Sequence, residues 1–349
     1  MIPVLYGKNE TLFEDNGIGS LSDAESCFCT EVLNEEYELE LKMPVLGVHS
    51  ENVIVNNIIK AKPNYIDRPQ PFRIYSVQKD IDGTVTVKAS HISYDVVGIP
   101  IMPFEAENLE AAIDNINNKQ NCNHPSLFTV YTNFEAEGTM KITTPSPMKT
   151  LLGDGENAVL GLYKGEYHYD YYDIELLEKR GVDKGIVFRS GKNLVEFHHE
   201  ENSEEAYSAI LGFWKKNDNP NLNVYSDIYS VNTDYKVNRI KVLEITSKQL
   251  EIGSATPTVD QLNEYLEKYL NDNNLSELKY TIDVKYAEDD NITKVNLGDT
   301  VGILLPEYRI RTTARCTKVV FDSLLERNDS IDIGEVDSGI VGEVADLSE

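Results

Sequence analysis

Three neighbouring residues have the side-chain types of a hydrolase triad: His91, Ser93 and Asp95. Nucleophilic catalysis needs these groups to converge, so that acid, base and nucleophile point at one another. Residues two apart on one extended strand share a face, but their side chains run parallel. We therefore expect Ile92 and Tyr94 to pack, while His91 and Asp95 satisfy local hydrogen bonds.

The cysteines are the next candidates for chemistry. Cys27 and Cys29 lie two apart on a probable strand, so both thiols would share one face. A structural zinc site needs two further ligands at a recognisable spacing, and none is apparent beside this pair. Free buried thiols are the prediction here. The two remaining cysteines are Cys122 and Cys316.

Several acids lie between residues 150 and 175 and suggest calcium: Asp154, Glu156, Glu166, Asp170 and Asp173. An EF-hand loop needs alternate acids and a glutamate at its twelfth position, and that order is absent. The run Gly-Asp-Gly-Glu at 153–156 lacks the Gly-Lys-Ser/Thr of a phosphate loop.

A histidine pair, His198 and His199, precedes Glu200 but does not complete the His-Glu-x-x-His pattern of a zinc protease. A solvated loop is the expectation there. The dense tyrosine cluster of 167–172 could bind sugar, and buried packing is the favoured interpretation. Taken together, the residues predict no catalytic, cofactor-binding or metal-ligating site and no cofactor.

The elements around these residues are mostly strands. Tyr37, Leu39, Leu41 and Met43 alternate with charged residues over 37–43. Residues 84–90 alternate in the same way and follow the turn pair Asp82-Gly83, so 72–90 is a predicted hairpin. Further strands are expected at 2–6, 53–60 with Asn56-Asn57 as a local irregularity, 127–133, 139–143, 206–214, 224–231, 237–246, 280–286 and 313–321, and residues 295–301 are expected to enter a hairpin with a Gly-Asp turn.

Helical spacing is weaker and more local. Leu109, Ala112, Ile113 and Ile116 follow a helical period, and 115–123 is polar and loop-like. The clearest helix is 258–271, where Thr258 and Gln261 fit a capping box. Hairpin-type loops are expected at 180–181 and 190–192, and a disordered acidic tail at 335–349.

Composition excludes some functions. The net charge is −27, from 59 acidic and 32 basic residues, so a basic nucleic-acid groove or an anionic membrane surface is disfavoured. The first residues lack the basic region of a signal peptide, and no run reaches the roughly 18 apolar residues of a membrane span. We expect synthesis in a cytoplasm and no membrane insertion.

Three blocks resemble one known family in family order. They are QPFRIYSV with DGTVTVKASHISYDV near 70–96, LLGDGENAVLGLYKGEYHYDYYDIELLEKRGVDKGIVFRSGKNL at 151–194, and VNLGDTVGILLP with TTARCTKVVFDSLLERNDSIDIGE after 295. The earlier LNEEYELELKMP is similar too. This pattern resembles the siphophage-type tail hub family, also called prophage endopeptidase tail or phage minor structural protein. Members are similar to the baseplate hub of contractile tails.

The resemblance implies an α+β, mainly β architecture with two small antiparallel β-barrel-like domains and intervening α/β domains. We predict a first barrel-like tube domain at 1–98, an α+β insertion at 99–190, a β-rich region at 191–250 and a helix-containing α/β domain at 251–294. Residues 295–334 then supply strands of the second barrel-like tube domain, before the tail at 335–349.

The same resemblance implies a function. It implies a homotrimeric hub ring in a virion tail tip, assembled in the bacterial cytoplasm, that continues the tail tube and contacts a distal tail protein and the tube or tape-measure protein. DNA would pass without specific binding. Two alternatives remain open: a tail-associated endopeptidase or cell-wall hydrolase, and a host-receptor or carbohydrate-binding module. Lytic activity in longer relatives resides in an added C-terminal domain, so we expect no catalysis here.

Overall fold

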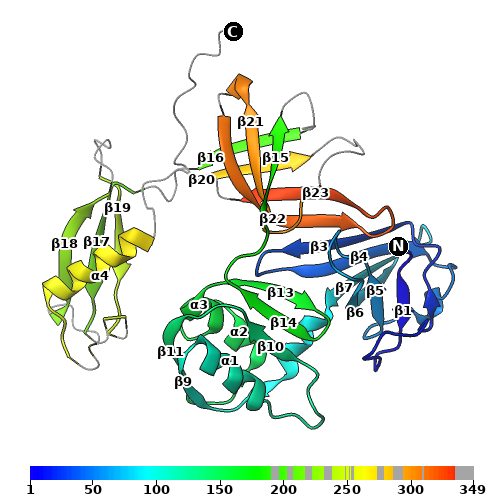
Figure 1. Ribbon diagram of the computed structural model, residues 1–349, viewed down its shortest axis with the longest axis horizontal. Coiled ribbons are helices and arrows are strands. Elements are labelled where there is room, and N and C mark those ends of the chain that lie inside the picture. Colours follow the sequence, from blue (N-terminus) through cyan, green and yellow to red (C-terminus); the bar gives the residue numbers. More distant parts are fainter. Residues whose placement is uncertain are drawn as a thin grey trace. The chain divides into compact units, whose positions relative to one another are not determined.

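The computed structural model describes residues 1–189, 196–202, 207–216, 222–231, 238–247, 249–250, 252, 255–272, 279–285, 294–308 and 310–334. The chain divides into two compact units (Figure 1). The first combines Met1–His198 with Ile282–Glu349, and the second is His199–Thr281. The fold is mainly β with fewer helices, as predicted.

The largest sheet has thirteen strands drawn from both ends of the chain. Its N-terminal strands are β1 (Val4–Tyr6), β2 (Gly19–Ser20), β3 (Ser26–Val32), β4 (Tyr37–Pro44), β5 (Ile58–Ala61), β6 (Gln70–Lys79) and β7 (Thr84–His91). Its C-terminal strands are β15 (Asp183–Arg189), β16 (Glu196–Asn202), β20 (Lys279–Lys285), β21 (Thr300–Leu305), β22 (Ile310–Asp322) and β23 (Arg327–Gly334). The path β16-β20-β23-β22-β3-β4-β7-β6-β5-β1-β2, with β21 and β15 branching from β22, is open and forms no closed barrel among the described residues.

The two clearest predicted strands, 37–43 and 84–90, are confirmed as β4 and β7. They pair antiparallel with Leu39 opposite Ala89 and Leu41 opposite Val87, and all four side chains are buried. The apolar faces that alternation marks in each strand therefore meet on one side of the sheet.

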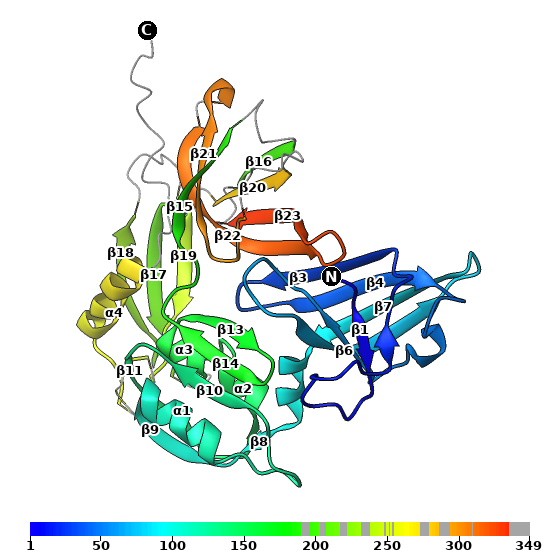
Figure 2. The ribbon, with the colours of Figure 1, turned by 45° about the vertical axis from the view of Figure 1, so that its right-hand side comes forward.

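Strand β22 joins the two ends of the chain by pairing antiparallel with β3 (Figures 1 and 2). In this register Phe321 lies opposite Cys29, and both are buried. Cys27 and Cys29 share the buried face of β3 as free thiols, as predicted, and Cys316 is buried as well. Cys122, in contrast, is exposed.

An insertion, defined here as residues 99–178, sits between β7 and β15 in sequence and carries the first three helices (Figure 1). Its elements are β8 (Pro100–Ile101), β9 (Phe104–Asn108), α1 (Leu109–Asn118), β10 (Thr129–Thr132), β11 (Glu137–Ile142), β12 (Ser146–Pro147), α2 (Met148–Leu152), α3 (Val159–Tyr163), β13 (Glu166–Asp170) and β14 (Asp173–Leu177). Helix α1 starts where the Asn108 side chain accepts the Ala111 N–H at 2.9 Å. The apolar residues that predicted this helix form its buried face.

The second unit is a three-stranded sheet covered by one helix. The sheet order is β18 (Val224–Ser230), β17 (Ala209–Trp214) and β19 (Ile240–Glu244), and the helix is α4 (Val259–Asp272). Leu262 and Leu266 of α4 pack on Trp214. The capping box is confirmed, because the Thr258 N–H donates to Gln261 Oε1 at 2.9 Å while the Gln261 N–H donates to Thr258 Oγ1 at 3.3 Å.

Two predicted boundaries in the first half are wrong. The strand expected at 53–60 begins only at Ile58, after the short helix η1 (Ser50–Asn52) and a turn in which Asn56 has φ 75°. An asparagine tolerates this left-handed backbone, which breaks a strand. The loop expected at 115–123 is helical as far as Asn118, because Ile116 is buried and the Asn115 amide donates to the Ala111 carbonyl.

Two predicted loops are also wrong. His198, His199 and Glu200 lie in β16, which pairs with β20 within the large sheet. Residues 180–181 form no hairpin, because β15 leaves them to pair in parallel with β21. The loop at 190–192 and the tail at 335–349 lie outside the described residues. None of the helices in the described ranges is long and apolar enough to cross a membrane.

Candidate functional site

The triad-like residues lie where β7 passes into the short helix η2 (Ile92–Gly98). Asp95 pairs with Arg73, whose Nη2 and Nε lie 2.6 Å and 2.9 Å from its Oδ2. Nδ1 of His91 accepts the Ser93 N–H at 3.2 Å and lies 2.9 Å from Ser93 Oγ. His91 and Ser93 therefore satisfy each other locally, and the three side chains do not form a triad.

The position of His91 selects its neutral form. The ring is fully buried, and its Nε2 lies 3.2 Å from Gln70 Oε1. Since Nδ1 accepts the Ser93 N–H, the proton sits on Nε2 and is donated to Gln70. Burial lowers the pKa of His91 from its usual value of 6.5 to about 3. A second proton on Nδ1 would face the N–H of Ser93.

Gln70 carries this hydrogen-bond chain from the sheet into the insertion. Its Nε2 donates to Asp170 Oδ1 at 2.8 Å, and its Oε1 accepts the Tyr171 N–H at 2.8 Å. The Nε of Arg68 donates to the same Asp170 oxygen at 2.7 Å. The turn between β13 and β14 is thus fixed to the start of β6.

A second histidine bridges two carboxylates at the same junction. Nε2 of His168 lies 3.1 Å from Asp67 and its Nδ1 lies 3.4 Å from Glu175. Both ring nitrogens therefore face acceptors, which favours the doubly protonated imidazolium. The hydrogen bond with Asp67 raises the pKa of His168, against the lowering effect of burial.

Two arginine–carboxylate pairs complete the junction. Nη1 of Arg180 lies 2.7 Å from Glu31, and only 10% and 6% of these two side chains are exposed. Arg315 binds Glu166 through both Nη atoms at 2.5 Å and 2.8 Å. The backbone N–H of Arg180 also donates to Glu166 at 2.6 Å. The segment after β14 is therefore held from two sides by charge-assisted hydrogen bonds.

We call this set the junction network: Glu31, Asp67, Arg68, Gln70, His91, Glu166, His168, Asp170, Glu175, Arg180 and Arg315. Its members come from β3, β6, β7, β13, β14 and β22 and from the loops beside them. Every polar contact within it is made by groups that are already paired, so it positions elements and offers no activated nucleophile. The network therefore acts as a structural connection between the sheet and the insertion.

Two glycines, Gly181 and Gly298, allow two backbone segments to approach each other closely beside the junction network. Gly181 has φ 74° and lies so close to Gly298 that an added Cβ would stand 2.1 Å from the Gly298 carbonyl carbon. Beside them the buried Asp299 accepts the Val182 N–H at 2.9 Å and pairs with Lys184 at 2.7 Å. The connection from β14 to β15 is thereby pinned to the turn before β21.

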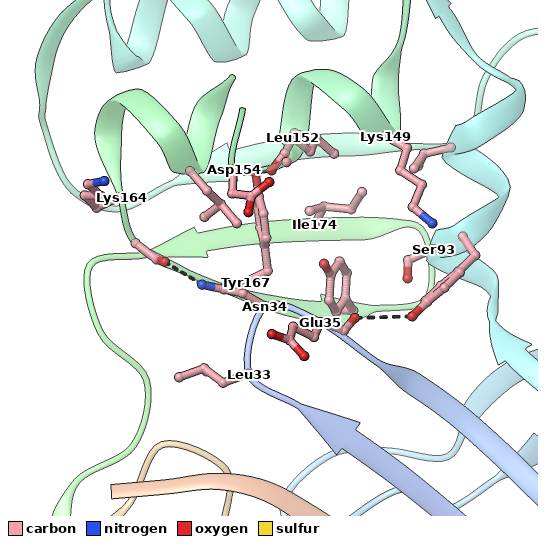
Figure 3. A pocket seen from close by; sticks show the side chains of 16 residues that line it. Leu33, Asn34, Glu35, Ser93, Lys149, Leu152, Asp154, Lys164, Tyr167 and Ile174 are labelled. Carbon is pink, nitrogen blue, oxygen red and sulfur yellow. Dashed lines mark hydrogen bonds between the residues drawn. The ribbon is translucent and has the colours of Figure 1, made fainter. Parts of the chain in front are cut away.

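A cavity of about 530 Å³ opens beside the junction network (Figure 3). Its walls are the turn between β3 and β4, helix η2, helices α2 and α3, and strand β13. Lys149 lies at one side, with its ammonium 4.7 Å from the centre of the Tyr94 ring. Charges of both signs line the opening, since Glu35 and Asp154 face it along with Lys164.

Asn34 closes one wall of this cavity and ties the sheet to the insertion. It occupies the turn between β3 and β4 with φ 61°. Its amide donates to the Gly165 carbonyl at 3.0 Å and accepts the Tyr167 N–H at 2.9 Å. One side chain thus supplies both hydrogen bonds that a neighbouring strand would make to β13.

We expect Asn34→Gly to lower the free energy of unfolding by about 1–3 kcal/mol, because two hydrogen bonds of about 0.5–1.5 kcal/mol each are lost. Asn34→Ala should cost about 1–2 kcal/mol more, since alanine disfavours the left-handed backbone. Urea unfolding measures both. Asn56→Gly is the matched control, because Asn56 shares the positive φ and its described hydrogen bonds are made by the backbone. An Asn34→Gly variant as stable as this control would contradict the role of the amide.

The remaining sequence candidates lie apart from one another. Among the acids considered for calcium binding, Glu166 binds Arg315 and Asp170 binds Arg68, while Asp154 lines the cavity. Within the described ranges no group of three or more His, Cys, Asp or Glu side chains is placed to hold a metal ion. In the tyrosine cluster of 167–172, Tyr167 is buried, and its three companions pack against apolar cores.

Sequence reasoning missed most of the junction network. Arg180 and Arg315 each meet a carboxylate 149 residues away in sequence. Gln70 lies 21 residues from His91, and no local pattern marks that pair. One local signal was available, because Arg180 is followed directly by Gly181. This pair was interpreted as a hairpin-type loop.

Residues 182–340 match the family model described as prophage endopeptidase tail. Three solved structures extend the likeness to nearly the whole chain. A prophage tail protein from Listeria monocytogenes is 14% identical, with a TM-score of 0.61, and the match covers 97% of this chain and 94% of that one. The fold is that of a prophage tail protein.

Two further structures agree with this assignment of the tail-protein fold. The prophage MuSo2 tail protein from Shewanella oneidensis has a TM-score of 0.63 at 12% identity, covering 96% of this chain and 98% of that one. A tail protein from Neisseria meningitidis has a TM-score of 0.59 at 11% identity, covering 97% of both chains. No curated protein matches. The family match bears out the resemblance to the prophage endopeptidase tail family over residues 182–340, and family match and fold together support a structural role in a phage tail.

Proposed function

We propose that this tail protein forms a trimeric hub ring at the virion tail tip, where it continues the tail tube. The observation that carries the proposal is the pairing of β22 with β3. It makes one continuous sheet from the two ends of the chain, and the junction network braces that sheet against the insertion. A rigid wall of this kind suits a tube component.

The two groups of strands in the large sheet suggest how a trimer could match the sixfold symmetry of a tail tube. One copy contributes an N-terminal and a C-terminal group of strands on either side of the β3–β22 pair. Three copies would place six such groups around an axis, which would let a trimer meet a sixfold tube, as the hub resemblance implies. The proposal includes a barrel-like arrangement of each group of strands. It also includes the predicted domain boundaries after residues 98, 190, 250, 294 and 334.

The proposed partners are a distal tail protein and the tail tube or tape-measure protein, and DNA would pass through the bore. Phosphate contacts would bind and slow the DNA, so the bore should be acidic or neutral. The net charge of −27 is compatible with this. Because the Debye length is about 8 Å at physiological salt, only charges that line the bore act on the DNA.

A structure of the assembled tail tip tests the ring. We expect three copies around the tube axis and a bore poor in lysine and arginine. The solution mass of the chain, measured with and without a partner tail protein, gives an earlier reading of the same stoichiometry. A different copy number at the axis, or a bore lined by basic side chains, would refute the proposal.

We also propose that the chain acts without catalysis of its own, although the family description mentions an endopeptidase. The support is that His91 is buried and neutral while Asp95 is bound to Arg73. We expect no turnover of casein or peptidoglycan by the purified protein. Hydrolysis that disappears in a single-residue variant such as His199→Ala would show that the chain is an enzyme after all.

A further inference from the structure

One end of the N-terminal sheet presents two fully exposed apolar side chains. Ile81 lies fully exposed in the turn between β6 and β7, and Leu46 follows β4 with 94% of its surface exposed. The two turns are held together because the Val45 N–H donates to the Gly83 carbonyl at 2.7 Å. We call Leu46 and Ile81 the apolar tip.

The apolar tip is flanked by acids. Asp80 and Asp82 stand on either side of Ile81 in sequence. Asp80 accepts a hydrogen bond from the Gln78 amide at 2.8 Å, and Asp82 accepts the Thr84 N–H at 2.9 Å. These bonds fix the turn and keep both carboxylates next to the exposed isoleucine. The tip is therefore an apolar projection with one carboxylate on either side of Ile81 in sequence.

An open surface pocket of about 570 Å³ has the complementary character, with apolar and basic side chains. It lies between the loop that precedes β6 and the first half of β15, and we call it the socket. Its lining residues are Tyr65, Ile66, Ile186, Lys184, Lys294 and Asn296. Ile66 is 71% exposed, so an apolar side chain stands at its rim without a cover among the described residues.

The socket is lined by two lysines, Lys184 and Lys294, although the chain as a whole has a net charge of −27. The Lys294 ammonium lies 5.5 Å from the centre of the Tyr65 ring, and Lys184 reaches the buried Asp299. Asn296 is 92% buried, and its Oδ1 has no hydrogen-bond partner within the described structure. The socket thus offers apolar contact and positive charge.

The apolar tip and the socket lie at opposite ends of β6. This strand has ten residues, which corresponds to about 33 Å at 3.3 Å per residue. One copy therefore cannot fill its own socket with its own tip. Two different, complementary patches on one chain make a head-to-tail contact, which closes into a ring when the rotation between copies allows it.

We propose that the apolar tip of one copy docks into the socket of the next copy around the ring. Ile81 contacts Tyr65, Ile66 and Ile186, while Asp80 and Asp82 approach Lys184 and Lys294. The inference rests on the proposed trimer and adds the surfaces that build it. It also assigns a direction to the ring, because every copy gives a tip on one side and a socket on the other.

Disulfide trapping tests the contact directly. In a Cys122→Ser background, which removes the exposed native thiol, Ile81→Cys and Ile66→Cys are introduced together and the protein is oxidised at submillimolar concentration. We expect covalent species that end at three chains on a non-reducing gel. Each single-cysteine variant, and the pair Leu12→Cys with Ile66→Cys, should remain monomeric. Leu12 serves as the control because it is also a large apolar residue at the surface, with 68% of its surface exposed.

Mixing two charged variants tests the head-to-tail geometry. Ile81→Asp removes the tip and Ile66→Asp removes the socket, and both sites are exposed enough for the chain to fold, which circular dichroism checks. Either variant alone should lose all oligomers in native mass spectrometry. Their equimolar mixture should give dimers and no trimers, because one intact tip and one intact socket remain. Lys294→Glu should weaken association, and Asp82→Lys should restore it.

The outcomes separate this inference from the proposed function. Three copies at the tube axis without cross-linking of residues 81 and 66 would overturn the docking and leave the ring intact. Cross-linked chains that grow past three, or dimers from Ile81→Cys alone, would overturn the closed head-to-tail ring. A copy number other than three in the assembled tail would refute the proposed function itself.

Discussion

Replacement of Arg180 by methionine should destabilise the protein by about 3–5 kcal/mol, the range for removing one partner of a buried ion pair. Only 10% of the arginine side chain and 6% of the Glu31 side chain are exposed. Methionine fills much of the arginine volume but leaves the Glu31 carboxylate buried without its cation. The loss reflects that uncompensated charge more than the attraction of the pair.

The arginine also binds the insertion to the sheet. Its Nη1 donates to the Tyr167 carbonyl at 2.8 Å, and its own carbonyl accepts from Arg315 Nη2 at 2.9 Å. Arg180→Met should therefore loosen β13 from the sheet as well as lower global stability. Native-state hydrogen exchange should show that the substitution accelerates the exchange of amides in 166–170 more than the exchange of amides in β4.

The matched control for Arg180→Met is Arg68→Met. Arg68 makes an ion pair with Asp170 at the same 2.7 Å distance, but 55% of its side chain is exposed. Exposed ion pairs contribute about 0.2–1 kcal/mol. The Arg68 guanidinium also lies 3.9 Å from the centre of the Tyr171 ring, a contact worth about 0.5–1 kcal/mol, so this variant should lose no more than about 2 kcal/mol. Adding Glu31→Gln to Arg180→Met should recover part of the loss, because it removes the stranded charge. Equal losses in the two arginine variants, measured by urea unfolding, would show that burial of the pair does not matter.

Local periodicity correctly predicted those strands and helices whose structure depends mainly on residues within the element itself. Strands β4 and β7 were predictable because alternation puts Leu39, Leu41, Val87 and Ala89 on one face, and burial of that face is what the sheet requires. Helix α4 was predictable because Thr258 carries its own start signal. Where an asparagine decided the backbone, as at Asn56, the strand pattern predicted too long an element.

The sheet's long-range connection had no local signal. Strand β22 pairs with β3 across nearly the whole chain, so Phe321 meets Cys29 through a register that neither segment specifies alone. The same holds for Arg180 with Glu31. Here the hub resemblance supplied the tail assignment, while the joint that holds the architecture together became visible only in three dimensions.

The triad-like run illustrates both outcomes. Local hydrogen bonds were expected for His91 and Asp95, and His91 does bond to Ser93. Asp95 instead binds Arg73, 22 residues away in sequence. The distant partners Gln70 and Arg73 were not predicted, because they reach the run from the neighbouring strand β6. The structural consequence is a fully buried histidine whose two ring nitrogens are both hydrogen-bonded, which makes protonation costly.

Acid should therefore destabilise this protein through His91. The folded pKa of His91 is about 3, compared with 6.5 in the unfolded chain. Between these two values the unfolded chain binds a proton that the folded chain does not, so stability falls as the pH decreases below 6.5. At about 1.4 kcal/mol per pH unit, this histidine should account for roughly 2–3 kcal/mol between pH 6.5 and about pH 4.5.

Other groups titrate in the same range, so the variant comparison is essential. The raised pKa of His168 has the opposite sign: its contribution is present below pH 6.5 and is lost as the pH rises through its folded pKa. The lowered pKa values of Asp67 and Glu166, set by their hydrogen bonds against the opposing effect of burial, remove stability as the pH falls. These terms are common to the wild type and to a His91 variant and cancel in the difference.

His91→Gln isolates the histidine contribution. Its amide nitrogen replaces Nε2 as the donor to Gln70, while the acceptor for the Ser93 N–H is lost, so the variant should be less stable than the wild type near neutral pH. The gap should narrow by about 2–3 kcal/mol on going from pH 6.5 to about pH 4.5, because glutamine takes up no proton in that range. Urea unfolding at a series of pH values measures this convergence. Parallel pH profiles for the two proteins would mean that His91 becomes protonated in the folded chain without cost, and that the buried network of Gln70 and Ser93 does not hold it neutral.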